Sequence, residues 1–103
     1  MNIAPGELLH RIEQGDPPVI VDVRSRAEFD RGHVPGAVHV PFWSVAAHRS
    51  DIPATPEELL VVYCGHGPRA RFAGAALRRL GFRRILYLNG HWSRWQRAKL
   101  PVE

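Results

Sequence analysis

Cysteine is almost absent from this chain: Cys64 is the only one among 103 residues, so no internal disulfide can form. This usage is typical of a reducing compartment, and we expect a cytoplasmic protein. No apolar stretch approaches the roughly 18 residues of a membrane span, so we expect no membrane partner. The first residues also lack the basic segment followed by an apolar segment that marks a secretory signal.

The chain is long enough for one modest core, and 45% of its residues are hydrophobic, so we expect a single domain over residues 1–103. Charge is unevenly distributed along it. Residues 1–63 hold five arginines and nine acidic residues, a balance of −4, whereas residues 64–103 hold eight arginines and one lysine against one glutamate, a balance of +8. The basic half is suited to small anions or an acidic partner surface, although solvated helix faces account for several of the arginines. No nucleic-acid motif accompanies them, so we expect no nucleic-acid partner.

Strand-like and helix-like segments alternate along the chain. Short apolar runs predict four strands, over residues 19–23, 37–40, 59–63 and 85–88. Helical spacing and end signals predict five helices, over residues 5–14, 25–32, 42–48, 68–80 and a terminal segment that carries two tryptophans. The alternation indicates an α/β fold of three layers, in which helices flank a mainly parallel sheet of four to five strands.

The spacing of apolar residues predicts the core faces of these segments. Ile3 is expected to lie on one helical face with Leu8, and residues 50–56 are expected to form a loop. In the segment over 42–48, the packing candidates are Phe42, Trp43 and Val45. In the helix over 68–80, an apolar stripe is expected to face the core: Phe72, Ala73, Ala76, Leu77 and Leu80.

Cys64 lies where a strand-like run ends and a short glycine-containing loop leads into a helix. In α/β proteins this order builds an anion cradle, because loop N–H groups and the helix N-terminus converge on one point. Positive potential at that point favours the thiolate, so we expect the thiol pKa to be lowered. The alternative is a buried structural cysteine, which leaves the flanking glycines and arginines unexplained.

Two further groups are expected at the same edge of the sheet, because the carboxyl ends of parallel strands lie together. Asp22 and Arg24 follow the first long strand, and His91 lies in the turn after the last strand. A metal site is not expected, since one cysteine and six scattered histidines show no zinc-type spacing.

Three groups of residues match, in order and spacing, the signatures of a known family. The first covers Val-Ile-Val-Asp-Val-Arg over 19–24, Glu-Phe at 28–29 and Gly-His-Val-Pro-Gly-Ala-Val-His-Val-Pro over 32–41. The second is the cysteine loop that begins at 63–64, and the third extends over 81–95. Taken together, they make the chain similar to the rhodanese family over essentially its whole length, which implies a rhodanese-like fold.

Active members of that family move sulfane sulfur through a cysteine persulfide. The resemblance therefore implies that Cys64 takes sulfur from a small anionic donor such as thiosulfate, without a cofactor. Cyanide or an external thiol would then accept that sulfur. An acceptor protein is another candidate for this role. Because the chain has no second thiol, the sulfur must pass to another molecule.

The resemblance also suggests roles for residues around Cys64. Loop N–H groups would bind the anionic sulfur species, and Arg69 would add a fixed positive charge. His66 would either donate a hydrogen bond to the donor or point to solvent at the pocket mouth. The residues expected to bind the donor are Gly65, His66, Gly67, Pro68, Arg69 and Ala70.

Outside the loop, Asp22 is expected to support the cysteine loop, with Arg24 as its ion-pair partner. Glu28 is expected to cap its helix and to take no part in the chemistry. His91 departs from the family pattern, which usually has a second glycine there, so it is expected to narrow the entrance or add a donor.

Two other functions stay open. Cysteine phosphatases and arsenate reductases use similar cradles, but by resemblance of motif they place an arginine six positions after the cysteine, where this chain has Ala70. Their loop is one residue longer, which suits a tetrahedral oxyanion better than a sulfur atom. The second alternative is a rhodanese module that binds a partner protein without turnover, because the presence of a nucleophile does not prove activity.

Overall fold

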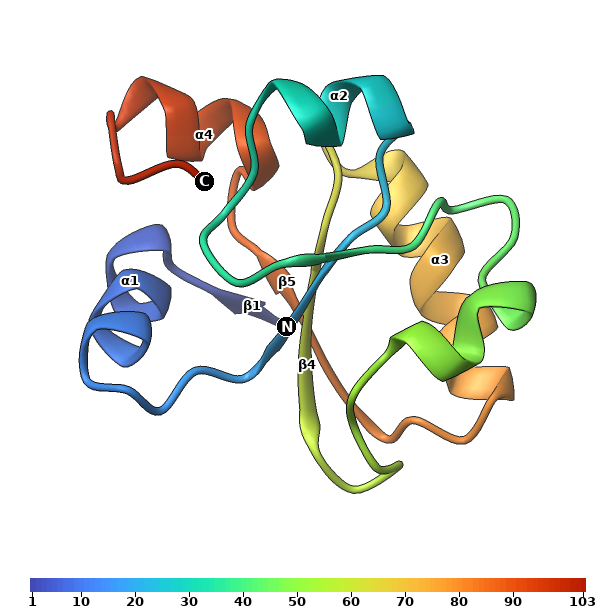
Figure 1. Cartoon of the computed structure of the whole chain (residues 1–103). Helices are drawn as coiled ribbons and strands as arrows, with labels where there is room; N and C mark the ends of the chain where they lie inside the picture. The colour runs from blue at the N-terminus through green and yellow to red at the C-terminus, as the bar shows by residue number, and fades with distance from the viewer.

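The carboxyl ends of five parallel strands form one edge of a single sheet in the computed structural model, which describes residues 1–103 (Figure 1). The strand order is β1-β5-β4-β2-β3, and every neighbouring pair is parallel. The strands are β1 (Asn2–Ile3), β2 (Val19–Asp22), β3 (Val38–His39), β4 (Leu59–Tyr63) and β5 (Arg84–Leu88). The expected parallel sheet is therefore confirmed.

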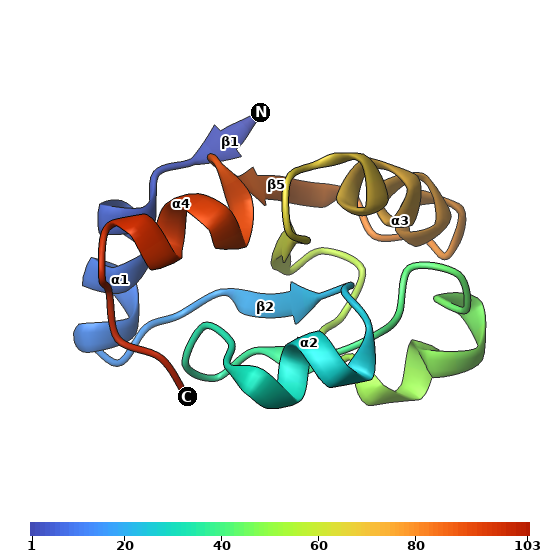
Figure 2. The same cartoon turned by 90° about the horizontal axis from the view of Figure 1, so that it is seen from above.

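Helices cover both faces of this sheet. They are α1 (Pro5–Glu13), α2 (Arg26–Arg31), α3 (Pro68–Arg79), α4 (His91–Arg97) and a 3-10 helix, η1 (Ala46–Asp51). Helices α1 and α4 lie side by side on one face in both views, whereas α3 lies on the other face with η1 (Figures 1 and 2). The three-layer prediction is confirmed. No helix is long and apolar enough to cross a membrane.

Strand β4 occupies the centre of the sheet, and its side chains alternate between the two apolar cores. Leu60, Val62 and Cys64 belong to the core under α3, whereas Val61 and Tyr63 belong to the core under α1 and α4. This alternation follows from the period of two in a strand. It sends the thiol of Cys64 and the phenol of Tyr63, its neighbour in sequence, to opposite faces of the sheet.

The sequence signals for the start of α2 and of α3 agree with the observed structure. Ser25 and Glu28 form a capping box: the Ser25 hydroxyl accepts the Glu28 N–H at 3.2 Å, and the Glu28 carboxylate accepts the Ser25 N–H at 3.0 Å. Helix α3 begins at Pro68, which needs no N–H partner in the first turn. Both helices therefore start beside the carboxyl edge of the sheet.

Two predicted elements differ from those observed. Ile3 lies in β1, where it pairs with Leu88 of β5, and not on a helix; a two-residue strand has no periodicity that a sequence pattern reveals. The helix expected over 42–48 is wrong. Phe42 and Trp43 lie in a turn closed by the bond from the Ser44 N–H to the Pro41 carbonyl at 3.1 Å. The helical turns begin only at Ala46 and continue to Asp51, into the segment over 50–56 for which the sequence predicts a loop.

Two aromatic side chains expected to pack inside are exposed. Trp43 and Phe72 are 61% and 64% exposed, and Phe42 contacts both rings edge-on, at centroid distances of 5.3 and 5.8 Å. The rest of the α3 stripe does face the core, with Ala73 and Leu77 fully buried. Phe72 lies at the margin of the stripe, where helical spacing alone does not separate core from surface.

Candidate active site

Helix α4 holds the cysteine loop against the end of the sheet. The N–H groups of Trp92 and Ser93 donate to the carbonyls of Cys64 and Gly65, at 3.0 and 3.2 Å. These bonds satisfy donors that the first turn of a helix otherwise leaves unpaired. Because the C=O and N–H of a trans peptide point in opposite directions, the next N–H groups in the loop turn away from α4.

The N–H groups of the loop converge on the sulfur of Cys64. The Gly67 N–H donates to Sγ at 2.9 Å, and the backbone N–H groups of His66 and Ala70 also hydrogen-bond to it. Burial raises the pKa of this thiol, but hydrogen bonds from the His91 side chain and from these N–H groups outweigh burial and lower the pKa to about 7. The expectation of a lowered thiol pKa therefore agrees with the geometry.

The two loop glycines are needed for different reasons. Gly67 has a φ of +135°, a region that side chains strongly disfavour. Gly65 has no positive φ, but a Cβ at this position would lie 3.1 Å from Nη2 of Arg69. The first glycine thus leaves space for the arginine, and the second permits the turn into α3.

Arg69 reaches the thiol, but its charge is shared with a residue of another helix. Its guanidinium donates to both oxygens of Glu28, at 2.7 and 3.1 Å, and also lies within hydrogen-bonding reach of the Cys64 sulfur. The bond from Arg69 lowers the pKa of the Glu28 carboxyl to about 2, against burial and with help from Ser25. Sequence reasoning missed this ion pair, because the capping box already accounted for Glu28.

His91 is brought to the thiol from the start of α4. Its Nδ1 accepts the backbone N–H of Cys64 at 3.2 Å, and its side chain is buried. In this contact the ring is an acceptor, and not the donor expected at this position. His66 is exposed, which agrees with the solvent-facing alternative for that side chain.

Asp22 and Arg24 form a buried ion pair beside the loop and do not touch the thiol. The Arg24 guanidinium binds both oxygens of Asp22, the closest contact being 2.6 Å, and Asp22 also accepts the Tyr63 hydroxyl at 2.7 Å. Burial raises the pKa of Tyr63, and the neighbouring Asp22 raises it further, so the phenol stays a donor. Asp22 therefore supports the loop through Tyr63, the residue that precedes Cys64, and through Arg24, which packs on Trp92.

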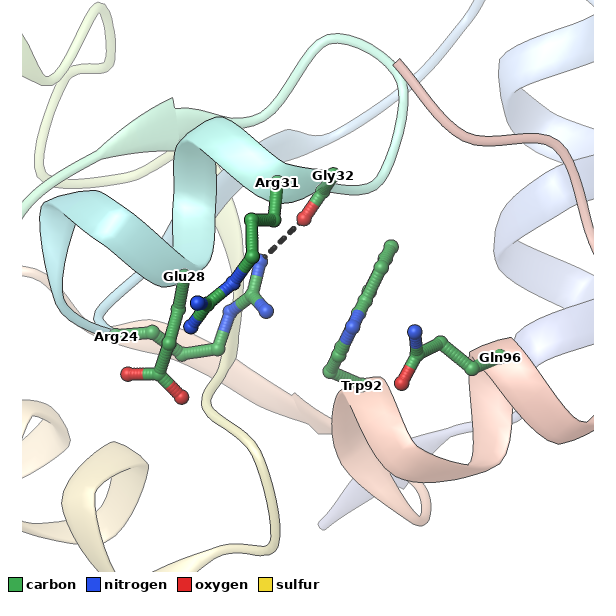
Figure 3. Close-up of a pocket in the computed structure, with 6 residues that line it drawn as sticks. All are labelled: Arg24, Glu28, Arg31, Gly32, Trp92 and Gln96. Atoms are coloured by element: carbon green, nitrogen blue, oxygen red, sulfur yellow. Dashed lines mark hydrogen bonds between the residues drawn. The ribbon is translucent and has the colours of Figure 1, made fainter.

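A polar cavity of about 430 Å³ lies between α2 and α4, as Figure 3 shows. Arg24 crosses it to the Gly32 carbonyl at 2.7 Å, with its guanidinium 4.6 Å from the centre of the Trp92 ring. Glu28 lies on its wall and contacts Arg69 of the cysteine loop, so this one carboxylate adjoins both the cavity and the loop. No three side chains that ligate metals converge anywhere in the chain.

Comparison with known proteins gives a consistent result. The family model of the rhodanese-like domain matches residues 4–98. A sulfurtransferase of Allochromatium vinosum is 33% identical over 95 residues, which cover 92% of this chain and 87% of that protein. The 3-mercaptopyruvate sulfurtransferase of Escherichia coli is 31% identical over 109 residues, covering 82% of this chain but only 38% of that longer protein. Among solved structures, the Alr3790 protein of Anabaena matches with a TM-score of 0.86 at 27% identity, over 98% of this chain and 90% of that one.

The buried ion pair is expected to carry much of the stability. Asp22→Asn leaves the Arg24 guanidinium buried without a counter-charge, so we expect the free energy of unfolding to fall by about 3–5 kcal/mol. Urea denaturation followed by circular dichroism measures this loss. The matched control is Asp30→Asn, which breaks the exposed Arg26–Asp30 pair and should cost no more than about 0.5 kcal/mol. Equal losses in the two variants would show that burial of the pair does not matter.

The reactivity of Cys64 should follow a lowered thiol pKa. Only the thiolate reacts with iodoacetamide, so the alkylation rate should rise with pH through a midpoint near 7, as the pKa of about 7 requires. The urea-unfolded chain should instead give a midpoint near that of free cysteine, about 8.5. A folded-state midpoint at or above the unfolded one would contradict the cradle geometry.

Proposed function

The chain belongs to the rhodanese-like domain family, and we propose that it is a sulfurtransferase that carries sulfane sulfur on Cys64. The observation that supports this most strongly is a thiol of lowered pKa surrounded by N–H donors at the carboxyl edge of the sheet. Similar relatives include named sulfurtransferases. For this chain we propose a small anionic donor such as thiosulfate, and cyanide or an external thiol as acceptor.

In the first step, the Cys64 thiolate attacks the outer sulfur of thiosulfate. A new S–S bond forms at Cys64, the S–S bond of thiosulfate breaks, and its electron pair leaves with sulfite. A thiolate and a thiosulfate dianion thus become a persulfide anion and a sulfite dianion, so charge balances without an external oxidant or proton. The loop N–H groups stabilise the negative charge of the thiolate before this step and of the persulfide after it.

In the second step, the acceptor attacks the outer sulfur of the persulfide. Cyanide forms a bond to that sulfur, the S–S bond breaks, and its electron pair returns to Cys64 as thiolate while thiocyanate leaves. A thiol acceptor leaves instead as its own persulfide. Because Cys64 is the only cysteine, no internal thiol competes for the sulfur. The two half-reactions predict ping-pong kinetics.

Donor binding competes with an internal carboxylate. Cys64 has no exposed surface, so the donor reaches the thiol only after neighbouring side chains move. The Arg69–Glu28 pair is the partly exposed group beside it, with the two side chains 32% and 28% exposed. We propose that an anionic donor replaces Glu28 on Arg69. Gly65, Gly67, Pro68 and Ala70 contribute backbone only.

One observation favours a second candidate function. Cys64 is completely buried, so a donor cannot reach the thiol in this conformation, and this favours a rhodanese module that binds a partner protein without turnover. A phosphatase or arsenate reductase is less well supported, because the loop is one residue shorter than theirs and position 70 holds alanine in place of their arginine. The lone cysteine supports a reducing, cytoplasmic location.

The assay that separates enzyme from binding module is thiocyanate formation from thiosulfate and cyanide. The native chain should form thiocyanate, and Cys64→Ser should fall to the uncatalysed rate, because serine cannot carry the sulfur. The substitution removes no core volume of consequence, so its thermal unfolding should stay close to native. Equal thiocyanate formation by the two proteins would overturn the enzyme proposal.

Competition for Arg69 predicts the effect of removing one charge. Glu28→Gln keeps an oxygen that can cap Ser25, but it weakens the hold on Arg69, so the KM for thiosulfate should fall by about two- to tenfold. The matched control is Asp30→Asn, which removes the same charge from an exposed position of α2. Steady-state kinetics in which Glu28→Gln and Asp30→Asn behave alike would contradict the competition.

A further inference from the structure

The cavity between α2 and α4 contains hydrogen-bond donors that the protein itself does not use. Nη1 of Arg24 takes part in none of the bonds of that guanidinium, and the indole N–H of Trp92, unlike that of Trp95, makes no bond within the chain. No buried side-chain nitrogen or oxygen lacks a partner, so both nitrogens keep accessible surface. The cavity is the space that both residues line, although their side chains are otherwise more than nine-tenths buried.

Two further donors reach the cavity from its rim. Arg31 is exposed, and no acidic side chain pairs with it. Gln96 lies one turn after Trp92 on α4 and adds its amide. Figure 3 shows the Arg31 side chain beside Glu28 on one side of the cavity and Gln96 beyond Trp92 on the other. Donors that converge from separate elements, two of them cationic, are suited to an anion.

The charges around the cavity leave one positive charge unbalanced. Arg24 is paired with Asp22, and Glu28, the only acidic residue of the wall, is paired with Arg69. Arg31 is therefore the charge without a partner. A carboxylate supplies the single negative charge that balances it, and its two oxygens match the planar fork of a guanidinium. A phosphate group carries close to two negative charges at neutral pH and is matched less well.

One ion pair separates the cavity from the reacting sulfur. Glu28 lines the cavity and accepts from Arg69 at 2.7 Å, and Arg69 lies within hydrogen-bonding reach of the Cys64 sulfur. When a donor replaces Glu28 on Arg69, no ion pair remains between the cavity and the cradle. The cavity volume of about 430 Å³ is in the range of small-molecule sites and suits a molecule larger than thiosulfate.

We propose that this cavity binds the sulfur acceptor, and that the acceptor is a thiol that carries a carboxylate. The carboxylate accepts hydrogen bonds from Arg31, from Nη1 of Arg24 and from the Trp92 indole, while the thiol group reaches the persulfide on Cys64. This inference rests on the proposed sulfur transfer and names the class of its second substrate.

The transfer to such an acceptor balances without an oxidant. The acceptor thiol loses its proton to solvent, and its thiolate forms a bond to the outer sulfur of the persulfide. The S–S bond at Cys64 breaks, and its electron pair returns to Cys64 as thiolate. The acceptor leaves as a persulfide that still carries its carboxylate.

The test uses two acceptors that differ only in the charge of one group. N-acetylcysteine has a carboxylate where N-acetylcysteine amide has a neutral carboxamide of the same size. Arg31→Gln removes the unpaired charge and breaks no ion pair of the chain. The matched control is Arg26→Gln, which removes an arginine whose side chain is 73% exposed on the same helix.

The first readout is kcat/KM for each acceptor, with thiosulfate as donor. Arg31→Gln should lower the value for N-acetylcysteine about tenfold, as the loss of one charge-assisted hydrogen bond requires, and the value for the amide less than about twofold. Arg26→Gln should change neither by more than about twofold. Comparing each thiol with itself removes the difference in intrinsic reactivity between the two acceptors.

Three kinetic results would overturn the proposal. One is an equal loss with the acid and the amide in Arg31→Gln, which would show that the charge has no particular role in binding a carboxylate. Another is a loss in Arg26→Gln as large as that in Arg31→Gln, which would reflect the overall charge of α2. The third is a native value for N-acetylcysteine in Arg31→Gln.

The second readout is binding without turnover, because it separates this proposal from the sulfurtransferase function. S-methyl-N-acetylcysteine has no thiol and cannot accept sulfur. In a titration followed by NMR, it should shift the indole signal of Trp92 and the backbone signals of Arg31 and Gly32 in the native chain, but not in Arg31→Gln. Its amide should shift none of them. Inorganic phosphate that binds there more tightly than this probe would overturn the carboxylate assignment.

The two proposals therefore fail separately. If the native chain forms no thiocyanate but the carboxylate probe shifts these signals, the sulfurtransferase function fails and the carboxylate site stands. If thiocyanate forms and the probe shifts none of them, the carboxylate site fails and the function stands.

Discussion

The buried guanidinium of Arg24 is the contact on which the arrangement of the site depends. It binds the Asp22 carboxylate at the end of β2 and the Gly32 carbonyl after α2, and it lies over the rings of Tyr63 on β4 and Trp92 on α4. Four elements far apart in the sequence are thus held at one edge of the sheet by a single side chain. An unpaired charge in this position would be very costly, so Asp22 and Arg24 are needed together. What they hold in place is the frame around the cysteine loop.

Within that frame, the reactivity of Cys64 comes mainly from hydrogen bonds. Arg69 is close to the thiol, but the Glu28 carboxylate offsets its charge. The loop N–H groups and His91 are held by backbone contacts and cannot turn away, because α4 binds the loop carbonyls. Fixed dipoles of this kind need no reorganisation when charge moves during a reaction. A cradle whose arginine is occupied favours an anion able to compete with a carboxylate, which a dianionic sulfur donor can do.

Much of this site could be predicted from the sequence, because its main signals are local. The apolar run before Cys64 and the glycines after it predict the strand, the turn and the start of α3. The order of strands and helices predicts that Asp22 and His91 lie at the same edge. The Arg69–Glu28 pair could not be predicted, because 41 residues separate the partners and the capping box already explained Glu28. The contact of His91 with the backbone N–H of Cys64 could not be predicted either, because 27 residues separate the two groups.

Intact-mass spectrometry after incubation with thiosulfate is the sharpest test of whether Cys64 carries sulfur as a persulfide. The native chain should gain the mass of one sulfur atom, peptide mapping should place that atom on Cys64, and dithiothreitol should remove it. Cys64→Ser should gain nothing under the same conditions. If the mass of the native chain stays unchanged, or if Cys64→Ser gains the same mass, Cys64 is not a carrier of sulfur.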